Sequence, residues 1–311
     1  MTLAISSLML LGAVIESMAE NADAQMYPPP GQMIDVGGYR LHLHCVGTGS
    51  PTVVIDAGLG DWSATWSSWV QPGVARSTNV CTYDRAGMGY SETGPLPRTS
   101  AQFAIELHTL MDRADIPRPY VLVGHSSGGL LVRVFAHEYT SDVAGVVLID
   151  SMNPKSAKPS AEGLATAAQG SDVNIDWLLT LPARLGLLRL LAGPLDLKAG
   201  LSSDAANPYA AFSVTTRYVQ TTLDESRGMP ESLAQAGIVK TLGTVPLIVL
   251  SRGLDSTEDW QRMQTDLLQL SSNSIQRIAD QSGHSVQIDQ PEAAVSAVVL
   301  LVEEMRRQAR Q

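Results

Sequence analysis

Short apolar runs recur along the chain and predict the strands of a sheet. Apolar and polar residues alternate over residues 39–46, which is typical of a strand with one exposed face. Several later runs are apolar at consecutive positions, as in parallel strands that are buried on both faces. The predicted strands cover residues 33–36, 39–46, 52–56, 80–84, 120–123, 143–149, 245–250 and 275–279.

Helical periodicity separates the later apolar runs. Over residues 100–113, Phe103, Leu107, Leu110 and Met111 form a single apolar stripe. Short turns join the early runs and helices join the later ones. This order predicts an α/β fold whose sheet is antiparallel at first and then parallel, with helices on both faces.

The alternation of strands and helices breaks between residues 152 and 244, where helix-like stretches occur without a clear strand. We interpret residues 153–244 as a helical lid, inserted after the sixth strand over the edge where the strands end. The core then consists of residues 27–152 and 245–311, and residues 1–26 form a separate N-terminal segment.

The N-terminal segment is apolar over residues 3–15, apart from Ser6 and Ser7. This length is typical of a signal peptide and is short of the roughly 20 residues that a membrane-spanning helix needs. Residues 22–24 (ADA) are similar to a cleavage site, although no basic residue precedes the apolar run. An export signal and a short membrane anchor are favoured, and both place the protein outside the cytoplasm or at a membrane. An ordinary apolar helix, with a cytoplasmic protein, is the alternative.

Composition narrows the classes of partner. The chain of 311 residues is 44% hydrophobic and 17% charged, so a large core is expected and disorder is not. Its 31 acidic residues exceed its 21 basic ones and no basic run occurs, which argues against nucleic acid as a partner. Cys45 and Cys81 lack the C-x-x-C spacing of a zinc site, and we expect no metal and no cofactor. They are either two buried thiols or one disulfide.

The pentapeptide at residues 124–128, GHSSG, carries the clearest chemical signal. It lies between a predicted strand and a helix-like run over residues 130–139. A serine in such a turn is held exposed at the carboxyl edge of the sheet. The glycines permit the tight turn, and the helix start provides N–H groups for an oxyanion. Ser126 is therefore the predicted nucleophile.

A serine nucleophile needs a base, and in this arrangement the partners follow in the order serine, acid, histidine. Only His137 and His284 follow Ser126 in the chain. His137 lies on the helix that Ser126 opens, three turns away, and so points elsewhere. His284 lies in the loop between the last strand and the last helix, and it is the predicted base.

The acid should lie just beyond a strand, between the serine and the histidine. Asp255 follows the seventh predicted strand and shares the C-terminal part of the chain with His284, so we favour it. Asp150, at the end of the sixth strand, is the alternative, and Asp259 is a weaker third candidate. The acid would fix the histidine tautomer and stabilise the imidazolium.

The oxyanion needs two N–H donors. Ser127, directly after the nucleophile, is expected to supply one, and Leu59, in the glycine-containing loop after the third strand, the other. Gly58 and His125 adjoin these positions and are expected to border the substrate. The apolar residues of the lid are candidates for an acyl or aryl pocket, although core packing explains them equally well. They are Trp177, Leu178, Leu187 and Leu191.

Four segments of the chain resemble the α/β-hydrolase superfamily. They are VIDAGLG at 54–60, YDRAGMGYS at 83–91, GHSSGG at 124–129, and SGH at 282–284 followed by DQPE at 289–292. The resemblance covers residues 33–311 and implies an eight-stranded, mostly parallel sheet with helices on both faces and a helical lid after the sixth strand. Residues 27–38 also resemble exported or membrane-anchored bacterial members.

The same resemblance implies that the second and fourth strands are neighbours. It therefore places Cys45 beside Cys81 and favours a disulfide. It also implies that Asp84 and Arg85 are structural residues that hold the loop after the fourth strand.

The resemblance also sorts the chemistry. Members that open epoxides or carbon–halogen bonds usually place an aspartate where this chain has Ser126. The serine implies acyl transfer to water, and so a serine esterase that acts on a small ester through an acyl-enzyme. A small-peptide or amide hydrolase and a non-catalytic ligand-binding protein are the alternatives. The oxyanion loop begins with Asp56-Ala57-Gly58 in place of the frequent His-Gly pair, a departure from the family pattern that concerns the donor and not the location of the loop.

Overall fold

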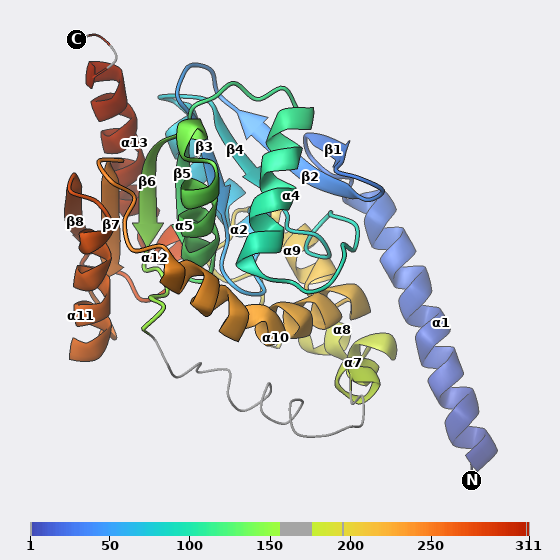
Figure 1. Ribbon diagram of the computed structural model, residues 1–311. Helices are drawn as coiled ribbons and strands as arrows, with labels where there is room; N and C mark the ends of the chain where they lie inside the picture. Colours follow the sequence, from blue (N-terminus) through green and yellow to red (C-terminus); the bar gives the residue numbers. More distant parts are fainter. Residues whose placement is uncertain (1, 156–175, 195, 309, 311) are drawn as a thin grey trace.

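A computed structural model describes residues 2–155, 176–194, 196–308 and 310 (Figure 1). Its centre is a single eight-stranded sheet in the order β1-β2-β4-β3-β5-β6-β7-β8. Every predicted strand is present, with ends within about two residues of the sequence prediction. The strands are β1 (Gln32–Asp35), β2 (Arg40–Val46), β3 (Thr52–Asp56), β4 (Val80–Tyr83), β5 (Tyr120–His125), β6 (Val143–Ile149), β7 (Leu247–Arg252) and β8 (Ser274–Ala279).

One strand of the sheet, β2, runs opposite to all the others. β2 pairs antiparallel with both β1 and β4, and all the remaining pairs are parallel. The predicted mixed sheet, antiparallel at first and then parallel, is therefore confirmed. Because the later strands are parallel, their carboxyl ends meet at one edge of the sheet.

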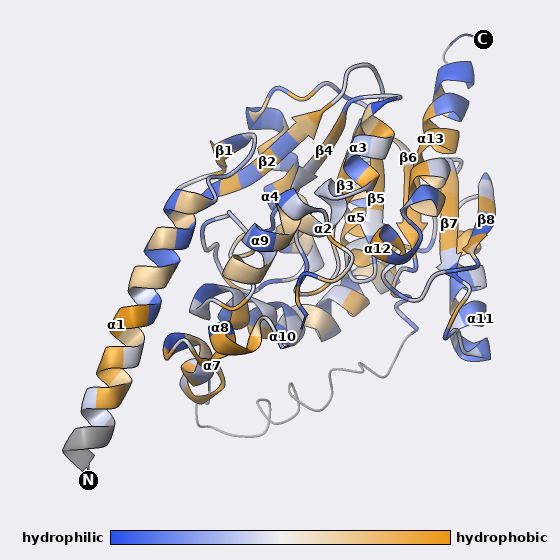
Figure 2. Ribbon diagram, turned by 180° about the vertical axis from the view of Figure 1, so that it is seen from behind, coloured by the Kyte–Doolittle hydropathy of each residue, from blue (hydrophilic) through white to orange (hydrophobic). Residues whose placement is uncertain are grey.

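Helices cover both faces of the sheet, which explains the consecutive apolar residues in its strands (Figures 1 and 2). In β5, Leu122 packs into the cluster formed with α4 (Ser100–Arg113) and α5 (Gly128–Glu138). Its neighbours Val121 and Val123 face the opposite cluster, formed with α3 (Val70–Ala75) and α13 (Pro291–Gln308). The remaining core helices are α2 (Ser63–Ser67), α11 (Glu258–Leu267) and α12 (Val286–Asp289), with 3-10 turns at η1 (Thr140–Asp142) and η2 (Leu268–Leu270).

A helical insertion separates β6 from β7, at the position predicted for the lid. Its described helices are α7 (Asp176–Arg184), α8 (Leu187–Leu191), α9 (Ser203–Phe212) and α10 (Thr216–Ile238). The predicted lid also includes residues 156–175 and 195, which lie outside the described residues. α10 packs against α4 and α5. From the start of α10, the Tyr218 hydroxyl donates to the Gly60 carbonyl (2.6 Å), so the insertion touches the loop after β3.

The N-terminal segment forms one long helix, α1 (Thr2–Met26), which extends away from the core (Figure 1). Arg189 of α8 ties it to the insertion through ion pairs with Glu16 (2.8 Å) and Asp23 (2.5 Å). The carboxylate of Glu16 is almost fully buried in this contact. Within the part of the chain that the structure describes, no helix has the length and hydropathy needed to cross a membrane.

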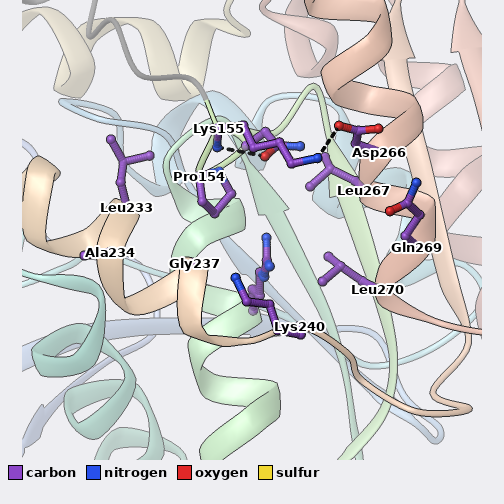
Figure 3. Close-up of a pocket in the computed structure, with 12 residues that line it drawn as sticks. Pro154, Lys155, Leu233, Ala234, Gly237, Lys240, Asp266, Leu267, Gln269 and Leu270 are labelled. Carbon is purple, nitrogen blue, oxygen red and sulfur yellow. Dashed lines mark hydrogen bonds and ion pairs between the residues drawn. The ribbon is translucent and has the colours of Figure 1, made fainter.

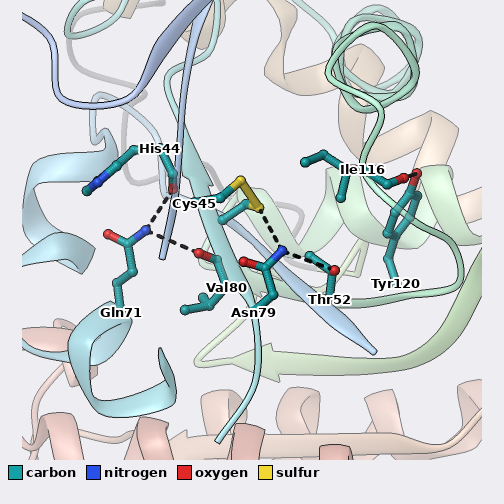
Figure 4. Close-up of a disulfide and its surroundings, with 9 residues drawn as sticks. His44, Cys45, Thr52, Gln71, Asn79, Val80, Ile116 and Tyr120 are labelled. Atoms are coloured by element: carbon teal, nitrogen blue, oxygen red, sulfur yellow. Dashed lines mark hydrogen bonds between the residues drawn. A yellow bond between two sulfur atoms is a disulfide. The ribbon is translucent and has the colours of Figure 1, made fainter. Parts of the chain in front are cut away.

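Cys45 of β2 and Cys81 of β4 lie directly opposite each other and are joined in a disulfide (Figure 4). Gln71 supports the same strand pair from α3, because its side-chain amide donates to the carbonyls of His44 (2.7 Å) and Val80 (3.4 Å). The disulfide and this amide hold the antiparallel part of the sheet to its parallel part.

Removing the disulfide should destabilise the fold. The bond closes a loop with a sequence separation of 36 residues, for which chain entropy gives a stabilisation of about 3 to 4 kcal/mol. We expect the Cys45→Ala/Cys81→Ala variant to lose about this much free energy of unfolding in urea titrations. Wild-type protein measured with a reductant is the control. Detection by mass analysis of two free thiols in oxidatively produced protein would contradict the pairing.

Candidate active site

Ser126 lies in the turn between β5 and α5, with a φ of 53°. This left-handed conformation is uncommon for a residue other than glycine and marks local strain. Two backbone bonds hold the turn: the Ser126 N–H donates to the Ile149 carbonyl (3.2 Å), and the Met152 N–H donates to the Ser126 carbonyl (2.9 Å). The strained serine is therefore fixed against the end of β6.

Glycines flank the serine because other chain segments approach it closely. A Cβ atom at Gly124 would lie 2.6 Å from the Gly128 carbonyl oxygen. A Cβ at Gly128 would lie 2.5 Å from the Ala57 carbonyl oxygen. Neither position has room for a side chain, so the turn after β5 can pack against the loop after β3 only with glycines there.

His284 lies between the predicted nucleophile and a buried carboxylate. Its Nε2 is 3.0 Å from Ser126 Oγ, and its Nδ1 is 2.5 Å from Asp150 Oδ2. The His284 side chain is 41% exposed, whereas that of Asp150 is fully buried. The three side chains thus form one hydrogen-bonded chain that runs from the protein interior to the surface.

Asp150 ends β6 in a left-handed conformation, with a φ of 39°. Besides the bond to His284, its carboxylate accepts bonds from Trp260 Nε1 (2.7 Å) and from the Arg252 N–H (3.2 Å). Burial alone would raise the pKa of this carboxyl group. The hydrogen bonds from His284 and Trp260, with the charges of His284 and Arg252, outweigh burial, and the pKa lies below its ordinary value. Asp150 is thus held as a carboxylate.

The structure corrects the predicted partner of the histidine, because Asp150 and not Asp255 is bonded to His284. Asp255 lies in the exposed loop after β7, and its carboxylate makes no hydrogen bond to any residue that the structure describes. Asp259, the third candidate, is exposed in the first turn of α11. The reason is sheet order: β6 is the neighbour of β5, whereas β7 lies one strand further away.

The two amides expected to hold an oxyanion are both unengaged. Across the described chain, neither the Leu59 N–H nor the Ser127 N–H donates to a protein acceptor. Gly58 brings the Leu59 loop against the turn, since a Cβ at Gly58 would lie 3.3 Å from Ser126 Cβ. The arrangement leaves two donors near Ser126 for a bound oxygen.

Arg85 binds the loop after β3, which contains Leu59. Its buried guanidinium donates to the carbonyls of Ala57 (2.7 Å) and Gly58 (2.6 Å) and forms ion pairs with Asp56 (3.2 Å) and Glu225 of α10 (2.8 Å). Arg85 itself lies in the loop after β4, so these bonds tie that loop to the loop after β3, a contact that the sequence did not predict.

Asp84 supports the loop after β4, as expected. Its carboxylate accepts bonds from the N–H groups of Ser63 and Tyr90, both at 2.9 Å. His42 Nδ1 lies at the same carboxylate, also at 2.9 Å.

His125, the residue before Ser126, contacts the loop that carries His284. Burial, and secondarily the charge of His284, lower the pKa of His125 to about 4, so its ring is neutral near pH 7. Its Nε2 lies 2.8 Å from the His284 carbonyl oxygen, which can only accept, so Nε2 carries the proton. His125 therefore positions the His284 loop without contributing a charge.

The structure places one candidate pocket residue of the lid, Trp177, at a cavity other than the serine site. Trp177 is 59% exposed and lines a cavity of about 730 Å³ with Arg98 and Asp224. Neither Ser126, His284 nor Asp150 borders that cavity. Leu178 and Leu187 are exposed on α7 and α8, as is Leu191.

Sequence reasoning missed two residues beside the carboxylate. Trp260 of α11 and Arg252 of β7 both bond to Asp150, and the Arg252 guanidinium lies over the Trp260 ring at 4.8 Å. A weak signal existed, since both residues follow the seventh predicted strand. No group of three or more His, Cys, Asp or Glu side chains is placed to bind a metal among the residues that could be searched.

Comparisons with curated proteins place the chain among sequences of mostly unassigned activity. It is 26% identical over 262 residues to the uncharacterized protein YqjL of Bacillus subtilis, covering 82% of this chain and 85% of YqjL. It is 33% identical over 127 residues to the probable transporter efuK of Hormonema carpetanum, covering 38% of this chain. It spans only 18% of that transporter's length, so the transporter's activity says little about this chain.

Solved structures share the fold over almost their whole length. Cfl2 of Burkholderia cenocepacia has a TM-score of 0.70 at 24% identity, covering 87% of this chain and 95% of Cfl2. The epoxide hydrolase CorEH has a TM-score of 0.68 at 20% identity, covering 88% and 98%. The haloalkane dehalogenase DatA of Agrobacterium tumefaciens C58 has a TM-score of 0.69 at 16% identity, covering 88% and 96%. At these identities the likeness concerns the fold alone.

The family model described as alpha/beta hydrolase fold matches residues 51–291. This span includes the turn at Ser126, the buried Asp150 and the loop that carries His284. The chain belongs to the α/β-hydrolase fold family.

Proposed function

We propose that this protein is a serine hydrolase that cleaves carboxylic esters through an acyl-enzyme. The observation that carries the proposal is the continuous hydrogen-bonded chain from Ser126 through His284 to Asp150. A carboxylate on one ring nitrogen directs the proton to that side and leaves the other nitrogen free to act as a base toward the serine.

In the proposed reaction, Ser126 Oγ attacks the ester carbonyl carbon while His284 Nε2 takes the hydroxyl proton. The carbonyl oxygen becomes an oxyanion between the N–H groups of Leu59 and Ser127. The bond to the alcohol oxygen then breaks, and His284 returns the proton to the leaving alcohol. A water molecule, deprotonated by His284, attacks the acyl-enzyme, and collapse of the second tetrahedral intermediate releases the acid and restores Ser126.

The residue at the turn separates this chemistry from that of the structural relatives. CorEH is an epoxide hydrolase and DatA a haloalkane dehalogenase. At the position that corresponds to Ser126, we expect such proteins to have a carboxylate nucleophile. A serine hydroxyl needs a base to become nucleophilic, and His284 lies at the right distance to serve. This pairing favours acyl transfer.

Replacing Ser126 should abolish ester hydrolysis. We expect Ser126→Ala to lower kcat for p-nitrophenyl butyrate by at least about 10³-fold, because the proposed acyl-enzyme forms on the Ser126 hydroxyl. Steady-state kinetics with p-nitrophenyl acetate and butyrate measure the effect, and a fluorophosphonate should label the wild type but not the variant. Ser272→Ala, which removes an exposed serine after η2, is the matched control. Equal rates for Ser126→Ala and wild type would refute the nucleophile.

The two aspartates should differ sharply in importance. We expect Asp150→Asn to lower kcat by on the order of 10⁴-fold, since an amide favours the wrong histidine tautomer. Asp255→Asn removes an exposed carboxylate without a hydrogen-bond partner in the described chain, and should change kcat by no more than about twofold. Parallel kcat measurements decide, and the reverse pattern would restore Asp255 as the acid.

The buried histidine should make stability fall in mild acid. The pKa of His125 lies near 4 in the folded protein and near 6.5 when exposed, so between these values the unfolded chain binds the extra proton. Stability is then lost as the pH falls through this window. Compared with His125→Gln, which keeps a donor but cannot titrate, wild type should lose on the order of 3 kcal/mol more between these pH values. Urea titrations across the range test this, and parallel pH profiles would contradict it.

A further inference from the structure

A second cavity, of about 410 Å³, lies apart from the serine, at the base of the helical insertion (Figure 3). Residues 153–155, where the chain leaves the core after β6, form one side. The end of α10 and the residues that lead back to β7 form another, and α5 and η2 complete it. Both ends of the insertion therefore meet at this cavity.

Arg133 of α5 is the most unusual residue of this lining. Its side chain is 8% exposed, yet no carboxylate of the described chain lies within ion-pair distance of its guanidinium. Among the described residues it makes one hydrogen bond, to the Val239 carbonyl, and its buried Nε has no partner there. Burial without a compensating charge lowers the pKa of Arg133 to about 10. Buried charges in proteins are normally paired, and the described part of the chain supplies no counter-ion for this guanidinium.

Other charges at the cavity increase the imbalance. Lys240 lies at its exposed rim and forms no ion pair with any described residue. Lys155 is already paired, through a 2.7 Å contact with Asp266. The lining thus contains three cations and a single carboxylate. This excess of positive charge occurs on a chain whose formal net charge is −10.

Besides the polar side chains of Asn153 and Gln269, apolar residues line the cavity. Leu233 of α10, Leu270 of η2 and Pro154 surround it with carbon surface, as Figure 3 shows. The volume lies within the range of pockets that bind small organic molecules. The lining therefore suits a molecule with an anionic head and a short apolar body.

We propose that this cavity is a binding site for a small organic anion. A carboxylate or phosphate head is held by the Arg133 guanidinium and the Lys240 ammonium group. The short apolar body packs against Leu233, Leu270 and Pro154. Because both ends of the insertion line the site, the ligand joins them to α5, the helix that Ser126 opens.

A different explanation of Arg133 makes a distinct prediction. Its bond to the Val239 carbonyl satisfies a backbone acceptor just after α10 ends. If this bond were the whole role of Arg133, replacing Arg133 would change the stability of the protein, but the wild-type protein would bind no anion at the cavity.

Calorimetric titration with hexanoate and hexyl phosphate tests the proposal, with hexan-1-ol as the neutral analogue. We expect wild type to bind one or both anions and to bind hexan-1-ol at least about tenfold more weakly, because charge-assisted hydrogen bonds are lost. Preference for hexanoate or hexyl phosphate identifies the head group. Lys240→Gln should weaken anion binding at least about tenfold.

Arg277→Gln is the matched control, because Arg277 is also exposed and unpaired within the described chain but lies on β8, outside the cavity. It should bind like wild type. Arg133→Gln should also weaken binding, and Lys240→Gln supplies the test if that buried change prevents folding. Absence of binding at millimolar anion, equal binding by hexan-1-ol, or equal affinity in wild type and Lys240→Gln would overturn the proposal. None of these results depends on whether Ser126 is a nucleophile.

Discussion

Parallel pairing of β5 with β6 is the constraint on which the candidate site depends. It brings the carboxyl ends of the two strands to one edge, where His125 lies opposite Ile149. The next residue of each strand, Ser126 and Asp150, has a positive φ, so both chains turn out of the sheet at the same level. The loop after β8 then needs only to place His284 between two side chains whose positions the sheet has already set.

The buried guanidinium of Arg85 links this edge of the sheet to the helical insertion. Arg85 binds two carbonyls of the loop after β3 and, on its other side, the carboxylate of Glu225 in α10. Replacing Arg85 would leave the buried carboxylates of Asp56 and Glu225 without the cation they share, which is costly in a protein interior. The shape of the oxyanion loop therefore depends on a helix that lies more than 100 residues later in the chain.

The sequence was informative where chemistry follows from order along the chain. Apolar runs located every strand, and elimination among histidines led to His284, which does lie against Ser126. It failed for the acid because both aspartates follow strands, and only the sheet order shows that β6 adjoins β5. The contact of Arg85 with the loop after β3 was not predicted for a related reason: its long side chain crosses between adjacent strands, which local sequence does not reveal. The sequence could not show whether the leucines of the predicted lid face a substrate pocket or the core, because apolarity alone does not say what a side chain contacts.

Arg189 gives the N-terminal helix a role that hydropathy does not suggest. One guanidinium on α8 pairs with both Glu16 and Asp23 of α1, and the Glu16 carboxylate is almost fully buried there. Separating the two helices would break both ion pairs at once, so α1 and α8 form one mechanical unit. These ion pairs therefore link the position of α8 to that of a helix 25 residues long. The direction of that helix relative to the sheet therefore depends on the position of the insertion.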